Sequence, residues 1–91
     1  MVYIHVRHQI ENYALWREGF DNHAPAREAG GATDEVLVLR NVEDPNDITV
    51  ILGWSDLDKA RTFIHSVSLR GAMQNAGVTN DPEVRILETT G

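Results

Sequence analysis

The chain has 91 residues, of which 42% are apolar and 24% charged, a composition typical of one small globular domain. A chain of this length buries only roughly 60–65% of its surface on folding, so its own core is marginal and oligomerisation is a common remedy. The net charge of −6 disfavours nucleic acid and anionic membrane surfaces as partners, because both attract basic patches.

Cysteine is absent, which excludes disulfides, thiolate nucleophiles and thiolate metal sites. The first seven residues lack the basic segment and apolar stretch of a signal peptide. No apolar run approaches the roughly 20 residues that span a bilayer. We therefore expect a cytoplasmic protein that binds neither nucleic acid nor a membrane.

Residues 2–8 alternate between two kinds of side chain, as a β-strand with two different faces requires. The two sets are Val2, Ile4 and Val6 against Tyr3, His5 and Arg7.

Residues 12–29 have the spacing of an amphipathic helix, with Asn12 as a plausible N-cap. Its apolar stripe consists of Tyr13, Trp16, Phe20 and Ala24. Pro25 should end or kink this helix near His23, or open a second short helix as its first residue. Gly30 and Gly31 then end the helical segment.

Two apolar strands are predicted over residues 34–42 and 48–54. The turn-forming residues 43–47 join them, which indicates an antiparallel hairpin.

A second helix is predicted to begin at Ser55 as its N-cap. Its stripe consists of Leu57, Ala60, Ile64 and Val67. Residues 66–68 weaken this helix, and a further turn or short helix runs on to Gly77. Pro82 opens a last strand over residues 83–88, which carries Val84 and Ile86 on one side.

This β-α-β-β-α-β order predicts a single α+β domain over residues 1–91, ferredoxin-like, with both helices on one face of a four-stranded antiparallel sheet. The hairpin strands are apolar on both faces, for example at Leu37, Leu39 and Ile51. A second copy of the chain is the simplest cover for the open face, so we expect a homodimer. The alternative is that these residues are merely part-exposed.

Several segments resemble one family. They are residues 16–30, the hairpin at 40–47 followed by Trp54, and the series Phe63, Ser66, Leu69, Met73 and 76–78. The chain resembles, over nearly its whole length, the small dimeric α+β barrel proteins labelled antibiotic-biosynthesis-monooxygenase-like or cyclase-like. The resemblance implies a dimeric α+β barrel. That superfamily includes cofactor-free monooxygenases, isomerases, cyclases and haem-handling proteins, and no catalytic set from any of them maps onto this sequence.

Histidines are the candidates for moving a proton near neutral pH. His5 should face the space between the two sheets of a dimer, and His23 should lie at the end of the first helix. The alternatives are an interface hydrogen bond for His5 and an anchor of the kinked backbone for His23. His65 ends the second helix, where the helix dipole alone could explain it. His8 is expected at a strand end, in solvent.

Substrate contacts are expected from aromatic and basic residues. The candidates are Tyr3, Arg7, Trp16, Phe20, Arg27, Trp54 and His65. The aromatic members could instead form the core, and Arg27 could pair with a surface acid. No metal-binding histidine spacing is present, so we expect no metal and no cofactor.

The leading hypothesis is a homodimer that binds a small, largely apolar, aromatic or polyketide-like molecule. A cofactor-independent monooxygenase is the activity that the resemblance suggests, with His5 or His23 as the proton acceptor. The alternatives are a polyketide-type cyclase and a non-catalytic ligand-binding or assembly module, so whether the chain is an enzyme stays open.

Overall fold

The computed structural model describes the whole chain, residues 1–91. Eight elements follow one another in the order β-α-α-β-β-α-α-β. They are β1 (Val2–Gln9), α1 (Tyr13–Asn22), α2 (Ala24–Gly30), β2 (Ala32–Arg40), β3 (Asp47–Trp54), α3 (Leu57–Ile64), α4 (Val67–Asn75) and β4 (Glu83–Glu88).

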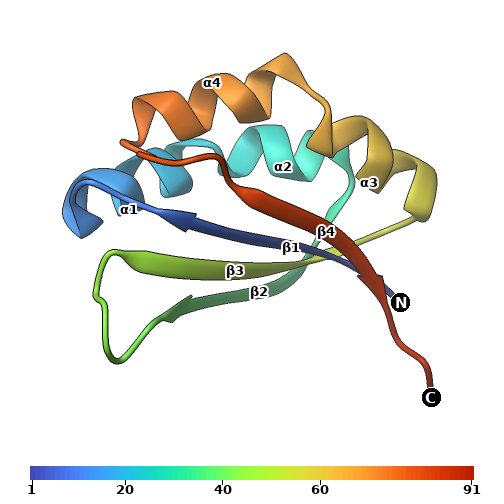
Figure 1. Cartoon of the computed structure of the whole chain (residues 1–91). Coiled ribbons are helices and arrows are strands. Elements are labelled where there is room, and N and C mark those ends of the chain that lie inside the picture. Colours follow the sequence, from blue (N-terminus) through green and yellow to red (C-terminus); the bar gives the residue numbers. More distant parts are fainter.

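The four strands form one antiparallel sheet in the order β2-β3-β1-β4. All helices lie on one side of this sheet, and its other side is bare (Figure 1). The predicted ferredoxin-like α+β fold is therefore confirmed. Each of the two predicted helical segments consists of two shorter helices, α1 with α2 and α3 with α4, in place of one.

The break between α1 and α2 lies where the sequence predicts it. His23 lies between the two helices, and Pro25 occupies the first turn of α2, where a missing N–H costs nothing. Gly31 ends α2 with φ of 115°, a conformation that favours glycine.

The strand register sets the two faces of the sheet. Ile4 of β1 pairs with Leu52 of β3, and both face the helices as part of the buried core. Trp54 is 1% exposed there, and its indole N–H donates to the Gly30 carbonyl oxygen at 3.0 Å. His5 pairs with Ile51, so both belong to the open face. The predicted alternation of β1 is thus confirmed.

Three local predictions are wrong. The N-cap of α3 is Asp56, whose carboxylate accepts from the Lys59 amide at 2.8 Å, and not Ser55. Val67 does not continue the apolar stripe of the preceding helix and is 82% exposed, because α3 ends at Ile64 and a new helix begins with Ser66 as its N-cap. His8 is 3% exposed, because the same alternation that buries Val6 continues through it.

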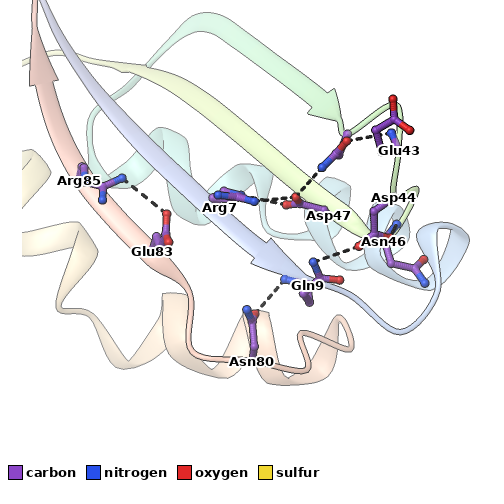
Figure 2. Close-up of polar contacts among 10 residues, drawn as sticks. Arg7, Gln9, Glu43, Asp44, Asn46, Asp47, Asn80, Glu83 and Arg85 are labelled. Atoms are coloured by element: carbon purple, nitrogen blue, oxygen red, sulfur yellow. Dashed lines mark hydrogen bonds and ion pairs between the residues drawn. The ribbon is translucent and has the colours of Figure 1, made fainter.

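A polar network lies on the open face of the sheet, at the end where the β2–β3 hairpin turns (Figure 2). Arg7 donates through Nε and Nη2 to the two carboxylate oxygens of Asp47, at 3.1 and 2.8 Å. Asn41 donates to the same carboxylate at 3.0 Å. These donors hold the pKa of Asp47 at about 2, below its usual 3.8.

Candidate binding pocket

A pocket lies between the sheet and helices α1 and α4. Its floor is aliphatic, formed by Val6, Val50 and Leu52 of the sheet, and α4 contributes Leu69 and Met73. The cavity measures about 50 Å³, and the whole hollow, counted with its mouth, holds about 460 Å³ of empty space. A small-molecule site is concave and mostly apolar in this way.

Aromatic rings form one wall of the pocket. Trp16 is 3% exposed and stacks on Phe20, with ring centroids 5.0 Å apart and planes 21° apart. The Arg27 guanidinium carbon lies 3.9 Å from the centroid of the Phe20 ring. Helical spacing on α1 produces this wall, because Trp16 and Phe20 are one turn apart. Three predicted substrate-binding residues are therefore together.

Arg27 is buried, at 8% exposure, and its Nη1 donates to the Phe20 carbonyl oxygen at 2.7 Å. Burial lowers its pKa, although a guanidinium stays protonated in proteins. It makes no ion pair, in contrast to Arg7, Arg17, Arg61 and Arg85. The expected alternative, pairing with a surface acid, does not occur.

His8 also lines the pocket, and sequence reasoning missed it. Its ring lies 5.8 Å from that of Trp16, and neither ring nitrogen has a hydrogen-bond partner. Burial lowers its pKa, with a smaller opposing effect from Asp47. A buried polar group without a partner is costly, and such groups often have a functional explanation. The alternation of side chains along β1 could have revealed it, because this alternation places His8 on the same face as Ile4 and Val6.

His23 lines the same pocket from the break between α1 and α2. Its Nε2 shares a hydrogen bond of 2.9 Å with the Ser68 hydroxyl of α4. Burial, and then the charge of Arg27, lower its pKa. The pocket therefore holds two imidazoles that are neutral at pH 7 and one guanidinium.

The other predicted site residues of β1 lie on the open face, away from this pocket. Tyr3 donates its hydroxyl proton to Glu35 at 2.9 Å, and this bond raises the pKa of Tyr3. Arg7 is occupied by Asp47. His5 has a buried Nδ1 with no partner.

Two further candidates lie outside the pocket lining. Trp54 packs on Phe63 in the core, with ring centroids 4.5 Å apart. This placement agrees with the alternative that Trp54 belongs to the core and does not contact a substrate. His65 is exposed and caps the end of α3.

No group of three histidine, aspartate or glutamate side chains comes together in a way that could hold a metal ion. None of the helices is long and apolar enough to cross a membrane.

Comparison with known proteins shows similarity in structure only. No protein-family model and no curated protein matches the sequence. An antibiotic-biosynthesis-monooxygenase-like structure from Bordetella bronchiseptica superposes with a TM-score of 0.80 at 16% identity, covering 98% of this chain and 96% of that one. SnoaB, a cofactor-independent oxygenase from Streptomyces nogalater, gives 0.77 at 18% identity, covering 99% and 93%. A further monooxygenase-like structure, from Deinococcus radiodurans, gives 0.72 at 20% identity, covering 100% and 94%.

This chain has the antibiotic-biosynthesis-monooxygenase-like fold. The resemblance seen in the sequence is thereby confirmed. At such low identity the likeness establishes the monooxygenase-like fold alone, and the activity has to be argued from the pocket.

Proposed function

We propose that this protein is a homodimeric, cofactor-independent monooxygenase that oxidises an electron-rich aromatic molecule, or a polyketide-like one, in the pocket between sheet and helices. The observation that carries the proposal is an apolar, aromatic-walled pocket that contains two neutral imidazoles, His8 and His23. The description of SnoaB as a cofactor-independent oxygenase supports the same choice among the chemistries of this fold. The proposed compartment is the cytoplasm.

The chemistry balances without an external reductant if the substrate supplies the electrons. A phenol with a free para position reacts with O₂ to give a quinone and water. One oxygen atom becomes the new carbonyl and the other leaves as water, and the phenol supplies all four electrons. The protein's task is then to bind the ring, exclude water and accept the phenolic proton.

His23 is the proposed proton acceptor, as expected from the sequence, and His8 is the second imidazole within the same pocket. An imidazole can accept a proton only in its neutral form, and burial favours that form in both histidines by lowering their pKa. His5 lies on the other side of the sheet. We propose a role for it at the dimer interface, and therefore in shaping the barrel.

The proposed dimer forms through the open sheet face. Leu37 and Leu39 of β2 and Leu87 of β4 are 51%, 43% and 40% exposed on a bare sheet. Burying these side chains against a second copy gains roughly 25 cal/mol for each Å² of apolar surface removed from water. The Nδ1 of His5 has no partner within the chain, so it is available for a hydrogen bond across such an interface.

The size of the cavity requires the pocket to widen when a ligand enters, and we propose that α4 is the wall that moves. About 50 Å³ is well below the roughly 300 Å³ at which ligand pockets begin. No residue within α4 is fully buried, so its displacement exposes little core. Segments with few buried contacts open at the lowest free-energy cost.

The test is oxygen uptake with a series of electron-rich phenols, without added flavin or metal, using ¹⁸O₂ to follow the label. We expect one labelled oxygen in the quinone. His23→Ala should lose turnover, and His65→Ala, an exposed histidine, should retain it. Absence of oxygen uptake across the series would contradict the oxygenase proposal.

The second candidate is a non-catalytic ligand-binding or assembly module, and the small cavity favours its assembly form, which needs no room for a ligand. A polyketide-type cyclase would use the same pocket and imidazoles without consuming oxygen. Product analysis under nitrogen separates these functions: cyclised product indicates a cyclase, and binding with no product indicates the module.

A further inference from the structure

Arg27 carries the only fixed charge in the pocket lining. No aspartate or glutamate lines the pocket. The two histidines contribute no charge at pH 7, because burial lowers the pKa of both. The pocket is therefore a mostly apolar hollow with one positive charge.

The nearest acids do not neutralise this charge directly. Asp21 forms an ion pair with Arg17, with Arg17 Nε and Asp21 Oδ1 separated by 3.1 Å. Glu28 is exposed on the surface of α2. Both acids act on Arg27 only at a distance, and burial outweighs them. Burying a charge with no opposite charge beside it is disfavoured, so an anion bound at Arg27 would offset part of that cost.

Much of the Arg27 fork is free to bind such an anion. Only Nη1 has a protein acceptor, the Phe20 carbonyl oxygen. Nε and Nη2 have none, and neither is a fully enclosed atom. A guanidinium offers five N–H donors in a planar arrangement that matches a carboxylate or another oxyanion.

The rest of the ligand has to be complementary to the aromatic wall beside the Arg27 guanidinium. The Phe20 ring lies directly below the guanidinium, and Trp16 continues the stack. Once the pocket widens to admit a ligand, a flat ring would lie along this wall at the offset distances that aromatic pairs prefer, while its charged oxygen reaches Arg27.

We propose that the pocket binds a flat aromatic monoanion, with its ionised oxygen, carboxylate or phenolate, on the Arg27 fork and its ring along Trp16 and Phe20. This rests on the proposed function only in using the same pocket, and it names the class of substrate.

Calorimetric titration under nitrogen tests the proposal with matched pairs of ligands. The first pair is 2-naphthoate and the neutral 2-naphthamide, and the second is 4-nitrophenolate and the neutral 4-nitroanisole. A charged hydrogen bond of the usual strength predicts that the anion binds roughly 10- to 100-fold more tightly than its neutral counterpart. Preference within one pair only would identify the oxyanion as carboxylate or phenolate.

Variants assign the preference to Arg27. Arg27→Met retains an apolar side chain on Phe20 and should abolish the preference, so that the anion and its neutral counterpart bind with about equal affinity. Arg27→Lys should retain part of the preference, because the charge stays. Arg61→Met is the matched control, since Arg61 is 63% exposed, lies near Asp58 and is outside the pocket lining. It should leave the preference unchanged.

Equal or weaker binding of both anions by the wild-type protein would overturn the proposal, whatever the variants do. So would an undiminished preference in a folded Arg27→Met variant. The assay contains no oxygen, so the two proposals fail separately. Anion preference without later oxygen uptake would retain this site and remove the oxygenase.

Discussion

Gly19 of α1 lies directly against Ala76, the residue that follows α4. A Cβ atom on Gly19 would lie 2.8 Å from the Ala76 Cβ, closer than carbon atoms pack. Both residues also line the pocket. The absence of a side chain at Gly19 therefore sets how closely α4 approaches α1 and how narrow the pocket is.

Gly19→Ala should destabilise the protein. Overpacking costs roughly 1–3 kcal/mol, which over most of that range exceeds the gain of about 1 kcal/mol from replacing glycine within a helix. Gly71→Ala is the control, because Gly71 lies in α4 with nothing within 4 Å of its added Cβ. It should stabilise the protein by about 0.5–1 kcal/mol. Urea unfolding measures both, and a stabilised Gly19→Ala variant would contradict the close contact.

Acid should remove the contribution of the Arg7–Asp47 pair. The pKa of Asp47 falls from 3.8 to about 2 on folding. A lowered carboxyl pKa stabilises the folded state fully above the unfolded value, and this stabilisation is lost as pH falls through the folded value. The free energy of unfolding should therefore drop between about pH 4 and pH 2.

Asp47→Asn should make that drop smaller, as measured by urea unfolding at a series of pH values. Asp58→Asn is the control, since its carboxylate is 96% exposed and lies 3.9 Å from Arg61. Equal pH profiles for the wild-type protein and Asp47→Asn would show that the pair contributes nothing.

His8→Leu should raise stability and lower ligand binding. Removing a buried polar group that lacks a partner relieves a cost of about 1–3 kcal/mol. The lowered pKa of His8 means that the unfolded chain takes up its proton first, so wild-type stability should fall as pH decreases below 6.5. His8→Leu should show less of this fall, with the remainder coming from His23.

Thermal unfolding at several pH values checks the His8 prediction. His65→Leu, at an exposed position, should leave both the stability and the pH profile near those of the wild type. A His8→Leu variant less stable than the wild type at pH 7 would show that the imidazole has a stabilising partner.

Charge on the open face should separate the proposed dimer. Leu37→Glu and Leu39→Glu each place a carboxylate among apolar side chains that a second copy would bury. We expect a shift from dimer to monomer in sedimentation equilibrium. Val42→Glu is the control, because Val42 lies in the hairpin turn at 96% exposure. A monomeric wild-type protein would exclude this interface.

Most of the fold could be predicted from local patterns. The alternation of β1 follows from the two-residue period of a strand, and the break at Pro25 follows from the missing N–H. Ser55 and Asp56 both suit an N-cap position. Which of the two neighbours caps α3 depends on the residue at which the helix begins, and this residue is Leu57. Val67 was assigned to the preceding helix because its spacing fits, although Ser66 begins a new one.

By itself, the sequence determined the order of the elements, the faces of the strands and the aromatic wall of α1, because each depends on neighbours within a few residues. Only the tertiary structure decided that His8 is buried without a partner, that Arg7 is paired and that Arg27 is not. These outcomes depend on which groups from distant segments come within hydrogen-bond reach. Periodicity can place a side chain on a face, but the packing of α1 and α4 on the sheet decides what it meets there.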